Sequence, residues 1–236
     1  MEKSDISSVL EVLNGKSANE IIKWIFDTIG VENVALASSL GIEDQVLTDL
    51  VLKQNDKARI FTLDTGRLPQ ETYSAMDKTM MHYNFKYEVL FPDRDKVEKM
   101  VSEYGANLFY ESIEKRKLCC DVRKVDILKK KLSTLKAWIC GLRKEQSVTR
   151  TNINVVEWDE ANNLLKFNPL IDWNEADVWN YLKKENVPYN KLFDKGYTSI
   201  GCAPCTRAIE KGEDLRAGRW WWEDPMHKEC GLHVKK

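Results

Sequence analysis

The sequence predicts an α/β protein with a doubly wound, mostly parallel sheet. Short apolar segments of strand length recur through the first two-thirds of the chain, and segments with apolar residues at helical spacing separate them. Apolar strands that alternate with helices are typical of a parallel sheet covered on both faces. With 236 residues and 43% hydrophobic content, the chain is long enough for a full core.

Each predicted element has a local reason. Ile21, Ile25 and Ile29 repeat at helical spacing, Pro69 suits the first turn of a helix, and Asn174 suits a helix cap. In chain order we expect a helix at 21–29, a strand at 34–37, a helix at 46–51, a strand at 59–64, a helix from 69, strands at 87–91 and 138–142, a β-hairpin formed by 155–158 and 164–167, and a helix from 174.

The charge balance excludes a strong global attraction to polyanions. The chain has 36 Lys and Arg against 37 Asp and Glu, so we expect neither nucleic acid nor an acidic membrane as a partner. No apolar run approaches the length of a membrane span. The polar start Met1-Glu2-Lys3-Ser4-Asp5 lacks the apolar core of a signal peptide. We therefore expect a soluble cytoplasmic protein.

Four of the six cysteines form two closely spaced pairs. Cys119-Cys120 is a tandem pair and Cys202-Ala203-Pro204-Cys205 is a C-x-x-C motif. Two such pairs supply the ligands of a [4Fe–4S] cluster or of a structural zinc ion. Disulfides are not expected to persist in the cytoplasm, and a thioredoxin-like C-x-x-C centre would leave the tandem pair unexplained. Because neighbouring side chains diverge on a helix or strand, we expect a distorted backbone at the tandem pair.

The remaining two cysteines suggest different roles. Cys140 is isolated in an apolar strand, and we expect it to be a small buried residue. Cys230 lies near the C-terminus between His227 and His233, in surroundings that suit a nucleophilic thiol.

Several polar loops follow the predicted strands, where ligands bind in parallel sheets. The loop 38–44 begins with Ser38-Ser39 and leads into a helix, so it is either an oxyanion site or a plain helix cap. It lacks the Walker pattern of nucleoside triphosphatases. Arginines near the paired cysteines predict a small polyanionic ligand close to the metal centre. The run Trp220-Trp221-Trp222 is either a stacking platform or a packing anchor.

Together these motifs resemble the assimilatory sulfonucleotide reductases, specifically the iron–sulfur branch of adenosine 5′-phosphosulfate (APS) reductases. The resemblance covers roughly residues 30 to 236, with the motifs in the same order. They are Leu63-Asp64-Thr65-Gly66-Arg67-Leu68, Cys119-Cys120 with Arg123-Lys124, Gly141-Leu142-Arg143-Lys144-Glu145-Gln146-Ser147, Gly201-Cys202-Ala203-Pro204-Cys205-Thr206-Arg207, Gly218-Arg219-Trp220-Trp221-Trp222 and Lys228-Glu229-Cys230-Gly231-Leu232-His233.

The resemblance implies a fold like that of the adenine-nucleotide α-hydrolases, and the reduction of APS to sulfite and AMP in sulfate assimilation. It implies that Cys119, Cys120, Cys202 and Cys205 hold a [4Fe–4S] cluster and that Cys230 is the nucleophile. It also implies a sulfonucleotide-binding domain over 1–217 and a mobile catalytic tail over 218–236. The substrate-binding residues it implies are Ser38, Ser39, Asp64, Gly66, Arg67, Lys124, Arg143, Arg150, Arg216, Arg219 and His233.

The implied reaction has two steps. The Cys230 thiolate attacks the sulfur of APS, which leaves an S-sulfocysteine on the enzyme, and thioredoxin or glutaredoxin then releases sulfite. The chain has no room for a fused thioredoxin-like domain, so the reductant is a separate partner; a homo-oligomer stays open. The alternatives are a reductase of 3′-phosphoadenosine 5′-phosphosulfate (PAPS) or of both substrates, a sulfur-transfer or nucleotide-activating enzyme of related fold, and a zinc-stabilised nucleic-acid-binding module.

Two departures from the family pattern stand out. Cys140 belongs to none of its motifs, and the loop from Gln146 to Arg150 is about one residue shorter than in relatives that carry Pro-Gly there. The second departure makes the position of Arg150 the least secure of the implied substrate contacts.

Overall fold

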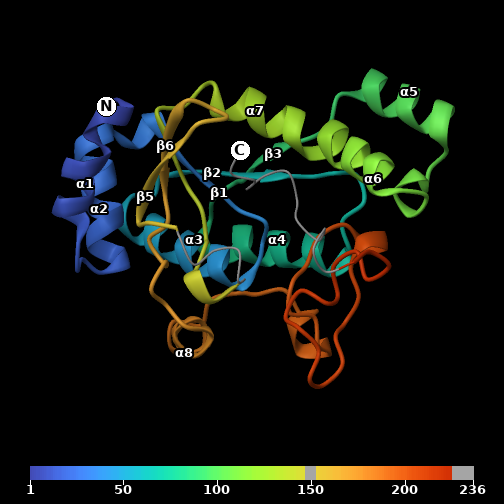
Figure 1. The fold of residues 1–236 in the computed structure, drawn as a ribbon. Helices are drawn as coiled ribbons and strands as arrows, with labels where there is room; N and C mark the ends of the chain where they lie inside the picture. The colour runs from blue at the N-terminus through green and yellow to red at the C-terminus, as the bar shows by residue number, and fades with distance from the viewer. Residues whose placement is uncertain (147–152, 225–236) are drawn as a thin grey trace. The chain divides into compact units, whose positions relative to one another are not determined.

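The computed structural model describes residues 1–146 and 153–224, and its course is drawn in Figure 1. The chain divides into two compact units, each built from segments distant in the sequence. Unit 1 consists of Met1–Thr62, Glu71–Glu88 and Leu132–Asn190, and unit 2 of Leu63–Gln70, Val89–Lys131 and Lys191–Lys236. The expected boundary between residues 217 and 218 stays a prediction, because most of the tail lies outside the described residues.

A six-stranded sheet with the order β3-β2-β1-β4-β6-β5 confirms the expected fold class. Its strands are β1 (Val34–Ala37), β2 (Arg59–Leu63), β3 (Glu88–Leu90), β4 (Ala137–Ile139), β5 (Val156–Asp159) and β6 (Leu164–Phe167). Strand β1 pairs in parallel with β2 and β4, and β4 pairs in parallel with β6. The register places Leu36 beside Ile60 and Ile139, all three buried, so apolar side chains form continuous rows across the central strands.

The predicted β-hairpin is confirmed as the antiparallel pair β5 and β6. Its turn contains Asn163 with a φ of 56°, a left-handed conformation that asparagine tolerates better than most residues. The fourth strand ends at Ile139, earlier than expected, so the residues from Cys140 onward belong to the loop that follows it.

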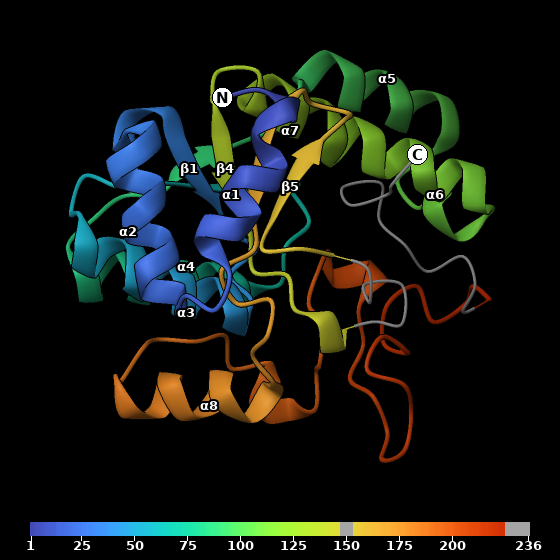
Figure 2. The ribbon, with the colours of Figure 1, turned by 60° about the vertical axis from the view of Figure 1, so that its left-hand side comes forward.

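The helices of unit 1 are α1 (Ile6–Leu13), α2 (Ala18–Ile29), α3 (Ile42–Gln54), α4 (Gln70–Tyr83, with its first residue in unit 2) and α8 (Glu175–Lys184). Helix α2 packs on α3 and β1, and α8 packs on α3, as Figure 2 shows. The expected start of α8 is confirmed: the Asn174 side chain accepts a hydrogen bond from the Asp177 N–H, and the Asp177 carboxylate accepts one from the Asn174 N–H.

Unit 2 contains one long helical run. Helix α6 (Ile113–Cys120) continues into a π-helical segment (Asp121–Val125) and then into α7 (Asp126–Leu132). Helix α5 (Arg94–Tyr104) precedes this run (Figure 1), and the described part of the chain after α8 holds only short 3₁₀ turns.

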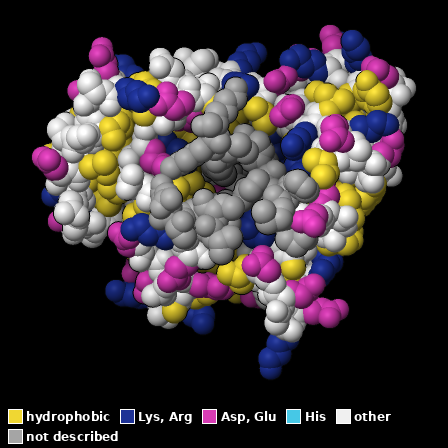
Figure 3. All heavy atoms as spheres, viewed as in Figure 1, with side chains coloured by type: hydrophobic (Ala, Val, Ile, Leu, Met, Phe, Trp, Pro, Cys, Tyr) yellow, Lys and Arg dark blue, Asp and Glu magenta, His cyan; other side chains and the backbone are white. Residues whose placement is uncertain are grey.

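On the face drawn in Figure 3, the described Lys and Arg side chains are interspersed with Asp and Glu. No helix within 1–146 or 153–224 has both the length and the apolar character needed to cross a membrane.

Candidate functional site

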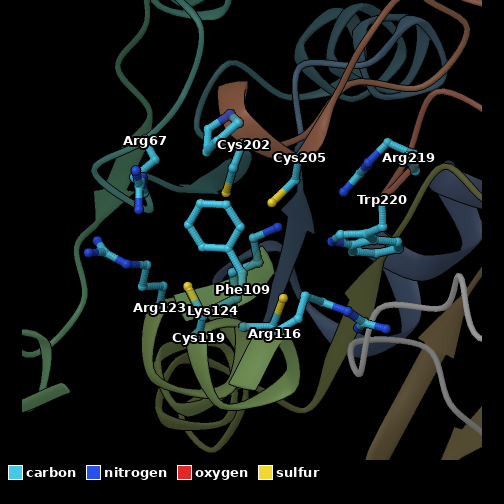
Figure 4. A pocket seen from close by; sticks show the side chains of 12 residues that line it. Arg67, Phe109, Arg116, Cys119, Arg123, Lys124, Cys202, Cys205, Arg219 and Trp220 are labelled. Carbon is cyan, nitrogen blue, oxygen red and sulfur yellow. The ribbon is translucent and has the colours of Figure 1, made fainter. Parts of the chain in front are cut away.

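The two cysteine pairs meet in unit 2. Cys119 and Cys120 occupy the last turn of α6, and Cys202 precedes a short 3₁₀ turn that ends at Cys205. All four are buried in one apolar cluster and line one cavity, and none forms a disulfide. In Figure 4, Cys202 and Cys205 lie above the cavity and Cys119 lies below it. The convergence predicted from the sequence is therefore present.

The tandem pair itself ends a regular α-helix, and the expected distortion of the backbone begins directly after it. Helix α6 ends at Cys120, and the next residues form a π-helical segment, a wider turn than the α-helix. Adjacent side chains of an α-helix point about 100° apart, so a regular helix would spread two neighbouring ligands. The π-helical segment contributes Arg123 and Lys124 to the cavity lining.

The C-x-x-C loop is fixed by its backbone and by its neighbours. The Cys205 N–H donates to the Cys202 carbonyl at 2.9 Å, and the Ala203 N–H donates to the Arg67 carbonyl at 2.8 Å. The Tyr110 hydroxyl donates to the Pro204 carbonyl at 2.9 Å. The loop thereby presents both thiols to the cavity from a rigid frame.

Burial controls the protonation of these thiols. It raises the pKa of Cys205 to about 12, an effect strengthened by the nearby Cys202 and opposed by Lys124 and Arg219. It also raises the pKa of Cys119, against the attraction of Arg123. Cys202 and the Thr65 hydroxyl share a hydrogen bond of 3.2 Å. Burial therefore favours the neutral form of the Cys119 and Cys205 thiols, and a metal centre must displace their protons.

The thiols surround a space instead of converging on one point. Among the described residues, no three His, Cys, Asp or Glu side chains are placed to hold a single metal ion. A structural zinc ion needs four ligands at about 2.3 Å from one centre. A [4Fe–4S] cluster also takes four thiolates, but each binds a different iron, so the sulfurs stand farther apart. Four buried cysteines around one cavity fit the four-thiolate ligand set of a [4Fe–4S] cluster.

Five basic side chains line the same cavity: Arg67, Arg116, Arg123, Lys124 and Arg219. Arg67 donates to the Ala106 carbonyl and to the Asn107 side chain, and its guanidinium stacks on the Phe109 ring. Arg123 donates to the Thr65 carbonyl at 2.7 Å, while its buried Nε has no acceptor among the described residues.

Trp220 lies between two of these arginines. Its indole is almost completely buried, with the Arg116 guanidinium 4.5 Å and the Arg219 guanidinium 4.6 Å from the ring centre. Figure 4 shows Arg219 above the ring and Arg116 below it. Trp220 has a φ of 40°, which is unusual for a large side chain, so the surroundings hold it in a strained backbone conformation. Trp220 is thus a packing anchor, one of the two roles that the sequence left open.

The two stacked arginines differ in their partners. Arg116 forms a bidentate ion pair with Glu223, with Nε–Oε1 and Nη2–Oε2 distances of 2.9 and 2.8 Å. Arg219 is also buried, but it forms no ion pair within the described part of the chain, and its Nε has no acceptor there. A buried guanidinium without an anion indicates a place for one.

In unit 1, the serine loop (residues 38–44) forms hydrogen bonds to one of its own side chains, the carboxylate of Asp44. The Ser39 N–H and hydroxyl both donate to Asp44 Oδ2, at 2.7 and 2.6 Å. Burial raises the pKa of Asp44 to about 6, although these hydrogen bonds oppose the shift. The Leu40 N–H donates to the Ser38 hydroxyl, and Leu40 has a φ of 62°. Substrate binding by Ser38 and Ser39 stays a prediction.

The other expected substrate residues fall into three groups. In unit 1, Arg143 is buried and donates to Glu43 at 2.9 Å. In unit 2, Asp64 accepts from the Gly66 N–H at 2.8 Å, and Gly66 adopts a φ of 71° beside Arg123. Arg216 is half-buried and does not line the cysteine cavity. The group outside the described residues consists of Arg150, Cys230 and His233.

The structure adds Glu223 to the site and gives Arg116 and Trp220 specific roles there. Arg116 precedes Cys119 by three positions and Cys120 by four, so it lies on their face of α6. That spacing could have identified it. The pairing with Glu223, 107 residues away, carries no sequence pattern. Cys140 is buried, as expected, and donates to Asn168.

Comparison with known proteins identifies the family of the chain. Residues 33–208 match the phosphoadenosine phosphosulfate reductase domain. The chain is 52% identical over 206 residues to an adenosine 5′-phosphosulfate reductase of Allochromatium vinosum. The matched segment covers 87% of this chain and 80% of that protein. A protein of the same name from Pseudomonas aeruginosa strain LESB58 is 42% identical over 236 residues, or 98% of this chain and 87% of that protein.

Solved structures support the fold. A phosphoadenylyl-sulfate (PAPS) reductase from Candida auris superposes with a TM-score of 0.75 at 24% identity, covering 89% of this chain and 98% of that one. An FMN adenylyltransferase of Candida glabrata, solved with FAD and pyrophosphate, gives a TM-score of 0.56 at 19% identity. The superposition covers 91% of this chain and 77% of that one. On the domain match and the sequence identities, the chain belongs to the phosphoadenosine phosphosulfate reductase family, and within it to the adenosine 5′-phosphosulfate reductases.

Proposed function

We propose that this protein reduces APS to sulfite and AMP in sulfate assimilation, in the cytoplasm, with Cys230 as nucleophile and a dithiol protein as reductant. The observation that carries the proposal is the buried four-thiol cavity lined by basic side chains, in which Arg219 has no anionic partner among the described residues. The names of the similar proteins support the choice of APS.

The four thiols Cys119, Cys120, Cys202 and Cys205 would hold a [4Fe–4S] cluster. The burial that raises the pKa values of Cys119 and Cys205 makes cluster assembly a proton-releasing event. When bound, the cluster would supply a fixed charged centre beside the basic side chains and would tie α6 to the C-x-x-C loop. No step of the proposed reaction transfers an electron through it.

The basic side chains would bind and orient the substrate. Arg219 is rigidly held by its stack on Trp220 and offers a planar fork of donors suited to sulfate or phosphate oxygens. Lys124 lines the same cavity and adds positive charge. Together they would stabilise the negative charge that the leaving phosphate gains as its bond to sulfur breaks.

The nucleophile needs only a short chain segment to reach the site. Glu223, at the end of the described residues, lies seven positions before Cys230. A fully extended chain of that length spans about 25 Å, so the reach of the thiol includes the cavity beside Trp220. The Cys230 sulfur would attack the sulfate sulfur, and the S–O bond to the AMP phosphate would break. This gives AMP and an S-sulfocysteine.

A separate dithiol protein, thioredoxin or glutaredoxin, would complete the turnover. One of its thiolates attacks the Cys230 sulfur, and the S–S bond breaks to release sulfite and leave a mixed disulfide. Its second thiol then resolves that disulfide and regenerates the Cys230 thiol. The dithiol supplies the two electrons that reduce sulfate to sulfite.

Replacement of Cys230 by serine tests the proposal. The protein, purified without oxygen, is expected to be brown and to contain iron and acid-labile sulfide. Cys230→Ser is expected to keep both and to form no sulfite from APS and thioredoxin, because the nucleophile lies outside the ligand set. Sulfite formation by Cys230→Ser would remove this residue from the mechanism. A colourless wild type that contains zinc would instead support the nucleic-acid-binding alternative.

A further inference from the structure

Trp220 carries one arginine on each face of its indole. The Arg116 and Arg219 guanidiniums lie 4.5 and 4.6 Å from the ring centre, and all three side chains line the cysteine cavity. Both arginines are more than nine-tenths buried. Two buried like charges across a single ring repel each other, so at least one of them needs a counterion.

Glu223 supplies a counterion to one face only. Its two carboxylate oxygens accept a fork of hydrogen bonds from Arg116, with 1% and 4% of the two side chains exposed. Arg219 keeps its charge without an ion pair among the described residues, and its Nε has no acceptor there. The indole therefore separates a neutralised guanidinium from an uncompensated one.

We propose that Glu223 is a positioning residue. It neutralises Arg116, so that Arg219 remains the one stacked guanidinium with a net positive charge and binds the substrate anion. The inference rests on the proposed function of the cavity as a sulfonucleotide site. Its physical basis is that an anion binds where the net charge lies. With Glu223 in place, that position is the Arg219 face of Trp220.

Removal of the carboxylate charge gives Arg116 the same attraction for anions as Arg219. In Glu223→Gln, an anion gains a second binding position on the wrong face of the indole. The Arg116 position is unproductive, because the substrate held there is displaced from the place set by Arg219. Binding therefore becomes tighter while turnover becomes slower.

A matched control exists in the same unit. Glu213 forms a bidentate pair with Arg207, at 2.8 and 2.7 Å, but neither residue lines the cavity. Glu213→Gln removes the same charge from the same kind of pair. The double variant Arg116→Gln/Glu223→Gln removes both charges and restores the balance on that face of Trp220.

The experiment titrates inorganic sulfate and APS into the cluster-loaded full chain carrying Cys230→Ser, which prevents turnover. Glu223→Gln is expected to lower the Kd of sulfate about tenfold, the effect of one added charge-assisted hydrogen bond, with a steeper dependence on salt. Glu213→Gln and the double variant are expected to match the Cys230→Ser parent. With Cys230 present, Glu223→Gln is expected to lower both KM and kcat for APS.

An unchanged sulfate Kd in Glu223→Gln, with the cluster absorbance intact, would overturn the proposal, as would a double variant that keeps the tighter binding. If Glu223→Gln is too unstable for titration, the melting temperature is measured against sulfate concentration. Sulfate is then expected to raise the Tm of Glu223→Gln more steeply than that of the wild type or Glu213→Gln, and equal slopes would overturn the proposal. If the wild type reduces no sulfonucleotide, the proposed function fails, but the sulfate comparison still decides the role of Glu223.

Discussion

The Arg219 guanidinium packs directly on the backbone of Gly201. A Cβ atom at position 201 would lie 2.6 Å from Arg219 Cζ, closer than real contacts allow. The chain therefore needs glycine at position 201, directly before the C-x-x-C motif, because Arg219 packs against its backbone. The φ angle of Gly201 does not itself require glycine. Cys202 follows this glycine directly, so the C-x-x-C loop is in close contact with the guanidinium that we propose binds the substrate anion.

Gly201→Ala is expected to displace Arg219 while leaving the four thiols in place. We expect kcat/KM for APS to fall at least tenfold, because loss of one charge-assisted hydrogen bond costs about 1.5 kcal/mol. The cluster absorbance is expected to stay within error of the wild type. Steady-state kinetics and the visible spectrum of the same preparation check both points, and normal kinetics would contradict the assigned role of Gly201.

Cys205→Ala is expected to lose iron and to lower the Tm, because one ligand of the proposed cluster disappears and three buried thiols remain without a metal. Cys140→Ala is the matched control, since Cys140 is equally buried but belongs to the sheet region of unit 1, where it donates to Asn168. Iron and labile sulfide per chain are measured for both. Equal iron content in the two variants would remove Cys205 from the ligand set.

Local sequence patterns predicted most of the fold but only part of the site. The apolar rows of β1 and β4 and the cap at Asn174 are properties of short segments, so their positions could be inferred. The tandem cysteines predicted a distorted helix, and the π-helical segment after Cys120 confirms it. The Glu223 pair with Arg116 could not be predicted, because it joins segments 107 residues apart. The serine loop could not be predicted in full either. Only the folded chain shows that the Asp44 carboxylate accepts both hydrogen bonds that Ser39 donates.

The buried Asp44 carboxyl predicts a specific pH dependence of stability. Its folded pKa, about 6, lies above the unfolded value near 3.9, so the folded state holds a proton that the unfolded state has lost. The contribution of Asp44 to the free energy of unfolding therefore falls as the pH rises from about 4 to about 6, by roughly 2–3 kcal/mol, and is constant above that window.

Asp44→Asn is expected to remove this slope, because an amide does not titrate and its oxygen can still accept from Ser39. Urea unfolding of the wild type and the variant between pH 4 and 8 measures the difference, in which all other titrating groups cancel. The stability of Asp44→Asn relative to the wild type is expected to rise up to about pH 6 and then level off. Parallel curves across the whole range would show that Asp44 ionises with an ordinary pKa.

The choice between APS and PAPS depends on whether the site can compensate a 3′-phosphate. That group adds about two negative charges, and it needs one or more further cations. Arg67 is among the substrate contacts that the resemblance implies, but its guanidinium is bound to Ala106 and Asn107 and stacked on Phe109. We therefore expect higher kcat/KM with APS than with PAPS, using thioredoxin as reductant at several salt concentrations.

Arg67→Ala is expected to reduce both efficiencies by a similar factor, because it loosens the 106–109 segment without removing a phosphate ligand. Equal or greater efficiency with PAPS, together with its selective loss in Arg67→Ala, would overturn the assignment of APS and leave the rest of the mechanism intact.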